Sequence, residues 1–159
     1  MTTLVLVRHA KSDWGDPHLD DHDRPLNDRG LRDAPVLARR VAARGIRPDA
    51  ILSSTALRAR TTAGFFGAEF GLVPELDPHL YGATARTLLG AAVARGAGCV
   101  MVVAHDPGMT VLASALSGGG IGHMPTCAVA VFEWTETDWA VASALDPDRW
   151  SFDAPGFGS

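Results

Sequence analysis

Residues 3–9 read TLVLVRH, and residues 99–105 read CVMVVAH. Each is an unbroken apolar run that includes β-branched residues, which is typical of a strand buried on both faces of a parallel sheet. Each run ends directly in a histidine, His9 in the first and His105 in the second. Because parallel sheets bind ligands beyond the carboxyl ends of their strands, the pair indicates one crevice. Taken singly, either histidine could be a hydrogen-bonded structural residue.

The segments between these two strands, and the segment after the second one, show helical periodicity and residues typical of helix starts and ends. Helices are expected from a cap at Asn27 to about Arg44, over Ala56–Phe70, over Ala83–Ala94 and from Pro107 to about Leu116. Further strands are expected at Ala50–Ser53 and Leu72–Leu76. Strands that alternate with helices predict a mostly parallel sheet covered on both faces, an α/β fold of three layers, α/β/α.

The last third of the chain shows a different pattern. Ala128–Trp134 and Trp139–Leu145 alternate between apolar and polar residues on either side of the turn-forming residues 136–138. This spacing predicts a hairpin that adds an antiparallel edge to the sheet. No clear pattern follows Pro147.

Length, charge and composition narrow the class of protein. The 159 residues suit a single domain, expected to span 1–159, and the net charge of −4 argues against nucleic acid or an anionic membrane as a partner. The first apolar run is too short for a signal peptide or a membrane span, so a cytoplasmic location is expected. Cys99 and Cys127 lie inside apolar runs and are expected to be buried free thiols rather than a disulfide.

Two arginines stand at strand ends, where an anion would bind. Arg8 directly precedes His9, and Arg58 lies in the first turn of the helix after the second strand. The free amides of a first helical turn favour an anion, and a guanidinium fork suits phosphate. Arg60 lies about 200° around the same helix, so only one of the two arginines can face the site. Each could otherwise belong to a solvated helix face.

Four short motifs occur in one order along the chain. Residues 4–14 (LVLVRHAKSDW) resemble the opening of the histidine phosphatase superfamily, the phosphoglycerate-mutase-like enzymes, with Ala10 in place of the usual glycine. Residues 24–30 (RPLNDRG) resemble its R-P-L-[ST]-x-x-G element, and residues 53–61 (SSTALRART) its S-P-x-x-R-A-x-x-T element. Residues 103–108 (VAHDPG) resemble its G-H-x-P-G element. The Ala10-Lys11-Ser12 continuation is similar to the small SixA-type phosphohistidine phosphatases.

The resemblance implies a site and a reaction. His9 would be the nucleophile that forms a phosphohistidine, and Arg8 and Arg58 would hold the phosphoryl oxygens. His105 would complete the pocket, and Ser12 would contact substrate. No cofactor or metal is expected, because the arginines neutralise the phosphoryl charge. The implied substrate is a phosphohistidine-bearing protein. The alternatives are a phosphatase or mutase that acts on a small metabolite phosphomonoester, and a non-catalytic phosphate-binding module.

Some features are left open by the sequence. His18, His22 and the aspartates Asp20, Asp21 and Asp23 could ligate a divalent metal, although a solvated loop has the same composition. The general acid of larger relatives has no clear counterpart here, and Glu75, Asp77 and Asp13 are the candidates. Oligomeric state is not indicated.

Overall fold

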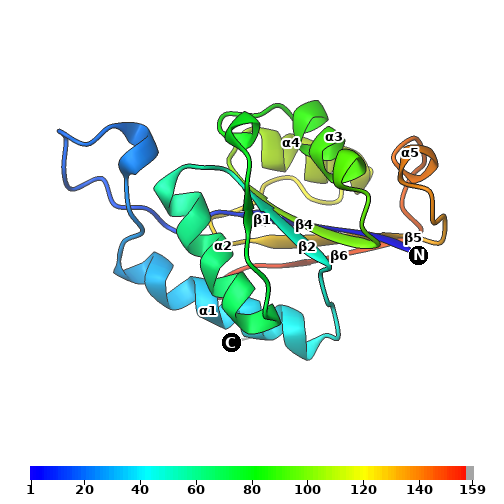
Figure 1. The fold of residues 1–159 in the computed structure, drawn as a ribbon, viewed down its shortest axis with the longest axis horizontal. Coiled ribbons are helices and arrows are strands. Elements are labelled where there is room, and N and C mark those ends of the chain that lie inside the picture. Colours follow the sequence, from blue (N-terminus) through cyan, green and yellow to red (C-terminus); the bar gives the residue numbers. More distant parts are fainter. Residues whose placement is uncertain (157–159) are drawn as a thin grey trace.

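Six strands form one sheet at the centre of the computed structural model, which describes residues 1–156 (Figure 1). The strand order is β3-β2-β4-β1-β5-β6. The first four of these are mutually parallel, whereas β5 runs antiparallel to β1 and β6 antiparallel to β5. The strands are β1 Thr2–Arg8, β2 Ala50–Ser53, β3 Glu75–Leu76, β4 Cys99–Ala104, β5 Val129–Trp134 and β6 Arg149–Asp153.

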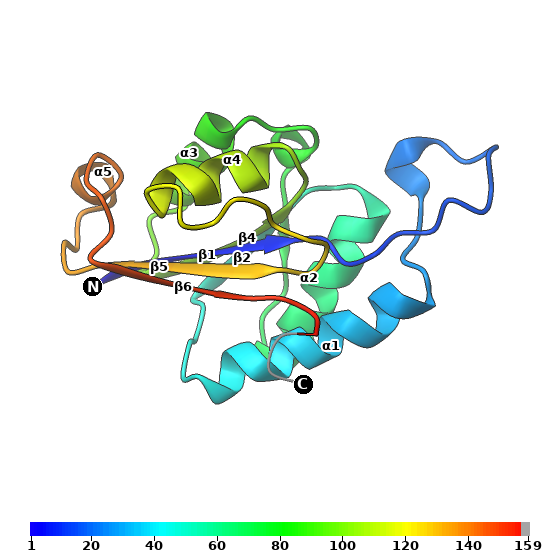
Figure 2. The same ribbon diagram turned by 180° about the vertical axis from the view of Figure 1, so that it is seen from behind.

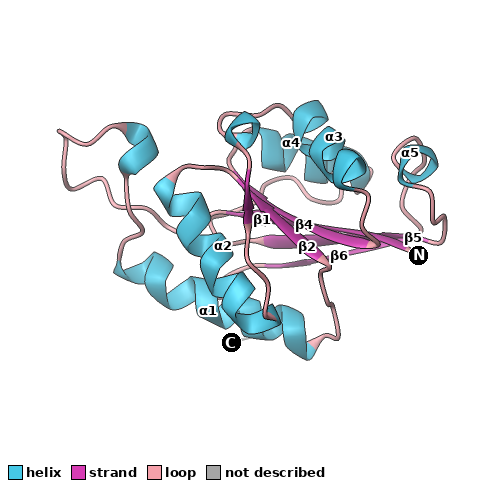
Figure 3. Cartoon of the chain, in the orientation of Figure 1, coloured by secondary structure: helices cyan, strands magenta, loops and turns pink. Residues whose placement is uncertain are grey.

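Helices cover both faces of the sheet, as the sequence predicts for an α/β/α fold. Figures 1 and 2 show α1 and α2 on one face and α3 and α4 on the other. The helices are α1 Asp28–Ala43, α2 Leu57–Phe70, α3 Ala85–Arg95, α4 Gly108–Leu116 and the short α5 Trp139–Ala142, with 3₁₀ turns η1 Asp21–Asp23 and η2 Pro78–Leu80. Figure 3 shows that η1 interrupts an otherwise irregular segment between β1 and α1.

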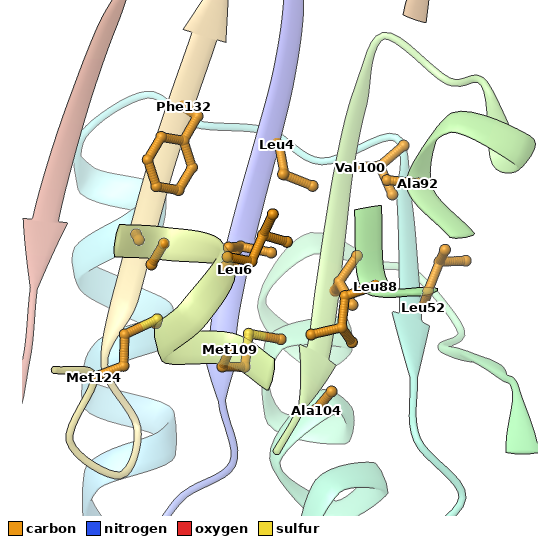
Figure 4. Packing of buried hydrophobic residues seen from close by; sticks show 14 of the residues in the cluster. Leu4, Leu6, Leu52, Leu88, Ala92, Val100, Ala104, Met109, Met124 and Phe132 are labelled. Atoms are coloured by element: carbon orange, nitrogen blue, oxygen red, sulfur yellow. The ribbon is translucent and has the colours of Figure 1, made fainter. Parts of the chain in front are cut away.

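Each face of the sheet has its own apolar core, and the two-residue period of the strands divides side chains between them. Leu4 and Leu6 of β1 pack with the α3 and α4 side, where Leu88 and Met109 lie (Figure 4). Val5 and Val7 pack with residues of α1 and α2 on the opposite face. Burial on both faces explains why β1 and β4 read as unbroken apolar runs.

The register of the two central strands places the histidines together. β1 and β4 are parallel neighbours, and Arg8 pairs with Ala104. The next residue of each strand is therefore a histidine at the same edge of the sheet, and the His9 amide donates to the Ala104 carbonyl at 3.1 Å. Figure 1 shows the segment after β1 projecting beyond this edge.

The ends of α1 and α2 lie close to the capping residues expected from the sequence. The Asn27 side chain accepts a hydrogen bond from the Gly30 amide at 2.9 Å and caps α1. α2 ends at Gly71, whose φ of 69° is left-handed and suits glycine. Both thiols are free, as expected; Cys127 is also buried as expected, whereas Cys99 is only half-buried.

The predicted closing hairpin is wrong in its second half. The partner of β5 is β6, from the segment that shows no sequence pattern, whereas the 139–145 segment begins with α5. Asp138 caps α5 by accepting hydrogen bonds from Ala140 and Val141. Trp139 packs against Trp134, with ring centroids 6.3 Å apart, and its indole donates to the Ala97 carbonyl at 2.5 Å. The Asp138 cap and the buried Trp139 indole therefore favour a helix at this position, although the alternating pattern predicts a strand.

The third strand is shorter than expected and comprises only β3, Glu75–Leu76. The Leu72 amide bonds to the Gly67 carbonyl at the end of α2, and Pro74 has no amide hydrogen to donate. The start of the expected strand therefore cannot join the ladder. Within the described residues, none of the helices combines the length and apolar character that a bilayer crossing requires.

Candidate active site

A cavity of about 300 Å³ lies at the carboxyl ends of β1 and β4. The side chains predicted from sequence to form the site, Arg8, His9, Ser12, Arg58 and His105, all line it. They come from β1, the segment after it, α2 and the turn after β4. The topology thus brings together residues up to 97 positions apart, as the rule for parallel sheets predicts.

The ring of His9 is buried and held in one tautomer. Its Nδ1 lies 2.7 Å from the Ala10 carbonyl oxygen, which can only accept, so Nδ1 carries the proton. The Ala10 amide, in the preceding peptide unit, donates to the Thr62 hydroxyl at 3.0 Å and helps to hold this residue in place. The lone pair of the neutral ring is therefore on Nε2. Burial lowers the pKa of His9 to about 3, with His105, Arg58 and Arg8 adding to the effect against the opposing Ala10 hydrogen bond.

His105 faces His9 across the cavity, with ring centroids 5.1 Å apart. Its Nε2 lies 2.8 Å from the Ser54 hydroxyl, which already accepts a hydrogen bond from the Ala56 amide. When the Ser54 hydroxyl donates this hydrogen bond to Nε2, the proton of the neutral His105 ring lies on Nδ1. Burial lowers the pKa of His105 to about 4, and Arg58 contributes in the same direction.

Both arginines are anchored by terminal nitrogens. Arg8 donates to the Met124 carbonyl at 2.9 Å and lies 3.5 Å from the Asp106 carboxylate. Arg58 donates to Asp21 twice, at 2.6 Å to its carbonyl and 2.9 Å to its carboxylate. In each case the guanidinium Nε is left without a hydrogen-bond partner.

Three buried nitrogens of the site have no hydrogen-bond partner: Arg8 Nε, Arg58 Nε and His105 Nδ1. Among the buried side-chain polar atoms of residues 1–156, only Asp33 Oδ2 shares this property. A buried donor without a partner lowers the free energy of unfolding by about 1–3 kcal/mol, so such donors are rare in folded proteins. Three such donors on residues lining one cavity indicate a ligand that accepts hydrogen bonds.

The cavity also has walls that the site prediction missed. Lys11, Trp14, Arg24, Asp106 and Thr126 line it. Arg24 is buried, donates to the Ser12 hydroxyl at 2.9 Å, and has its guanidinium carbon 3.4 Å from the Trp14 ring centroid. The signal was present, because Arg24 opens the R-P-L motif, but the motif indicated only the start of a helix.

Other candidates lie elsewhere. Arg60 is exposed and borders a separate hollow beside Pro74, so Arg58 alone of the pair lines the cavity. Among residues 1–156, no group of three or more His, Cys, Asp or Glu side chains is arranged to hold a metal ion, including the 18–23 loop.

The three candidate general acids do not line the cavity. Glu75 lies on β3 and forms an ion pair with Arg95 at 3.0 Å. Asp77 caps η2 through the His79 amide. Asp13 accepts a hydrogen bond from the Gly15 amide at 2.6 Å.

Residues 4–85 match the family model of the histidine phosphatase superfamily, branch 1. This chain belongs to that superfamily. An uncharacterised chloroplastic protein of Arabidopsis thaliana is 33% identical to it over 164 aligned residues, which cover 94% of this chain and 75% of the relative.

Solved structures of the superfamily are similar over nearly the whole chain. A protein from Agrobacterium tumefaciens described as a SixA phosphohistidine phosphatase superposes with a TM-score of 0.81 at 33% identity, covering 97% of this chain and 99% of that one. A protein from Nakamurella multipartitia with the same description gives 0.85 at 26% identity, covering 98% and 96%. Membership in this superfamily, together with the two SixA-type structural neighbours, supports phosphatase activity for this chain.

Proposed function

We propose that the chain hydrolyses phosphohistidine on a protein substrate through a phosphohistidine intermediate on His9. The observation that carries the proposal is the set of three unpartnered buried donors beside a neutral imidazole. A phosphoryl group presents several acceptor oxygens, and its transferring oxygens need positive donors during reaction. Arg8, Arg58 and His105 are the proposed phosphoryl ligands.

In the first step, the Nε2 lone pair of His9 attacks phosphorus, and the bond from phosphorus to the substrate nitrogen breaks. The substrate imidazole, protonated on its other nitrogen, keeps the electron pair of that bond and leaves as a neutral ring. The Ala10 carbonyl holds the Nδ1 proton and stabilises the positive charge that develops on the ring. In the second step, water attacks the phosphorus, the bond to Nε2 breaks, and inorganic phosphate leaves. The low pKa of His9 keeps the ring neutral and nucleophilic at pH 7.

The choice of substrate follows from the leaving group. Asp106 is the one carboxylate among the residues that line the cavity. Its oxygens accept hydrogen bonds from Thr110 and lie beside Arg8, so it is occupied as an acceptor. An alkoxide leaves poorly without an acid to protonate it, whereas imidazole is a far better leaving group. Phosphohistidine and activated aryl phosphates are therefore favoured over alkyl phosphates.

The same proposal includes independence of metal ions, because Arg8, Arg58 and His105 already supply positive charge to the phosphoryl oxygens. Activity should then persist in excess chelator. A single domain over residues 1–159 also stays a prediction, and its last three residues lie outside the described ones. The cytoplasmic location and a substrate contact for Ser12 stay predictions as well; the Ser12 hydroxyl accepts a hydrogen bond from Arg24.

The test compares kcat/KM for a phosphohistidine peptide, an aryl phosphate and phosphoglycerate at one pH. We expect the first two to be cleaved efficiently and phosphoglycerate weakly. His9→Ala should abolish turnover, with His79→Ala as a matched control, because His79 is exposed and outside the cavity. Trapped wild type should carry an acid-labile, base-stable phosphate on His9.

The alternatives give different results in the same experiment. Equal cleavage of alkyl phosphates would indicate a metabolite phosphatase with a general acid that the cavity lining does not reveal. Binding of phosphate without turnover of any substrate would indicate a non-catalytic module. Near-normal activity of His9→Ala would refute the mechanism altogether.

A further inference from the structure

Asp21 lies in η1 and is bound from three directions at the edge of the cavity. Its carboxylate accepts hydrogen bonds from Arg58 at 2.9 Å, from the Tyr81 hydroxyl at 2.5 Å and from Arg24 at 3.1 Å. Its backbone carbonyl accepts a second hydrogen bond from Arg58. These contacts span 37 residues to Arg58 and 60 to Tyr81, so they tie the segment after β1 to two distant parts of the chain.

The contacts divide the Arg58 guanidinium into two edges. Asp21 binds both terminal nitrogens, and the buried Nε has no partner. Asp21 therefore occupies the terminal nitrogens and leaves Nε as the unpartnered donor of this side chain. Arg58 has a long, flexible side chain, and Asp21 already holds it in one conformation. Arg58 therefore loses less conformational entropy when a ligand binds.

Tyr81 links the same carboxylate to the second histidine. Its ring lies edge-on to His105, with centroids 5.5 Å apart, while its hydroxyl donates to Asp21. The Tyr81 hydrogen bond and the Arg58 contacts hold the pKa of Asp21 well below its usual range, although burial opposes them. The Asp21 carboxylate is thus ionised, and its full negative charge orients the Tyr81 hydroxyl and the Arg58 guanidinium.

We propose that Asp21 is a positioning residue that orients Arg58 for the phosphoryl group, with Tyr81 fixing the Asp21 carboxylate. The inference rests on the proposed function, in which Arg58 binds phosphoryl oxygens. Asp21 itself does not touch the substrate in this scheme. It acts through Arg58, so its effect on catalysis depends on an intact guanidinium at that position.

Asp21→Asn tests this with little change of shape. One amide oxygen cannot accept from Arg58, Tyr81 and Arg24 together, and the amide nitrogen cannot accept at all. Loss of a charge-assisted contact predicts a fall in kcat/KM of roughly 10- to 100-fold with an aryl phosphate, and a matching loss of vanadate affinity. Asp20→Asn is the matched control, because Asp20 is exposed in the same loop and its side chain caps nothing.

A double-mutant cycle with Arg58→Lys separates positioning from a general structural effect. If Asp21 acts through Arg58, then Asp21→Asn should lower kcat/KM by less than threefold in the Arg58→Lys background. Full multiplicative effects of the two substitutions would overturn the inference while leaving the proposed function intact. An Arg58→Lys variant with normal activity would instead refute the role of Arg58 in the proposed function.

Tyr81→Phe keeps the test decisive if Asp21→Asn fails to fold. It removes the hydroxyl and retains the ring that contacts His105. We expect a smaller fall in kcat/KM, roughly 3- to 10-fold, that disappears in the Arg58→Lys background. Equal activity of Tyr81→Phe and wild type in both backgrounds would contradict the proposed role of Tyr81 and of its contact with Asp21.

Discussion

His9 and His105 are buried in one small cavity that three arginines, Arg8, Arg24 and Arg58, also line, and this burial decides the protonation of the two rings. Protonation of a buried imidazole near guanidinium groups is unfavourable, because burial and the neighbouring positive charges both disfavour the imidazolium form. The pKa of His9 therefore falls to about 3 and that of His105 to about 4. Their hydrogen bonds then assign different tasks to the two neutral rings. His9 presents a lone pair on Nε2, whereas His105 presents an N–H on Nδ1 when Ser54 donates to its Nε2.

The two arginines of α2 differ in burial, so they should differ in their effect on rate. Arg58 is 6% exposed and lines the cavity, whereas Arg60 is exposed and lines a separate hollow. Arg58→Ala should lower kcat by roughly 30- to 1,000-fold, through loss of about 2–4 kcal/mol of transition-state stabilisation. Arg60→Ala should stay within about twofold of wild type. Equal losses in kcat for the two variants would contradict the assignment.

The low pKa values also predict the pH profile. In the free enzyme both rings are mostly neutral from pH 7 down to about pH 5, so neither histidine should produce an acid limb near its ordinary pKa of about 6.5. The acid limb of kcat/KM should follow the second ionisation of the substrate phosphate instead. Two aryl phosphates with different phosphate pKa values should therefore give limbs that differ by the same amount. A limb fixed near pH 6.5 for both substrates would show that an enzyme imidazole titrates there.

At the scale of whole elements, the start of α1 controls one wall of the cavity. A Cβ placed on Gly30 would lie 2.2 Å from the Lys11 carbonyl oxygen, far inside contact distance. That carbonyl also accepts the Asn27 amide at 3.0 Å, so the helix start and the Lys11–Ser12 segment are packed directly together. Gly30, the glycine that ends the R-P-L motif, is therefore required for the close approach of the start of α1 to the Lys11 carbonyl.

Gly30→Ala should destabilise the protein by about 1–3 kcal/mol, because the extra methyl forces backbone apart, and should reduce activity because Lys11 and Ser12 line the cavity. Gly64→Ala in α2 is the control. A Cβ there meets nothing within 4 Å, so helix propensity alone should stabilise by about 0.5–1 kcal/mol with activity unchanged. Urea midpoints of the two variants should shift in opposite directions, and a shared direction would disprove the packing argument.

For the molecule as a whole, the sequence predicts most strongly what depends on local pattern. The unbroken runs of β1 and β4 and the caps of α1 and α2 are confirmed within a residue or two. The meeting of His9 and His105 is also predictable, because parallel strands that follow the same pattern end at the same edge.

Features that depend on long-range packing escape this reasoning. β6 is mostly exposed or half-buried and shows no apolar alternation, so only its pairing with β5 makes it a strand. In α5, the buried residues Trp139 and Ala142 are three apart, a helical spacing that the alternating pattern conceals. The contacts of Asp21 with Arg58, and the place of Arg24 in the cavity wall, depend on how an irregular loop folds back, which residue spacing does not encode.

The protonation of the site should also appear in the stability of the whole molecule. In the unfolded chain both histidines bind a proton below about pH 6.5, whereas in the folded protein they do so only near pH 3 and 4. Between pH 6.5 and about 4 the unfolded state therefore binds more protons, and folding stability must fall as pH decreases. Each histidine contributes a slope of at most about 1.4 kcal/mol per pH unit.

This slope can be separated from other titrations by substitution. The carboxyl of Asp21 has a lowered pKa, so its contribution is present above its ordinary value of about 3.8 and is lost only below it. We expect the urea-unfolding free energy of wild type to fall between pH 6.5 and 4.5. The His9→Gln/His105→Gln variant should show a shallower dependence over that range, because glutamine does not titrate. Parallel pH curves for the two proteins would mean that the buried imidazoles accept protons as readily as they do in the unfolded chain.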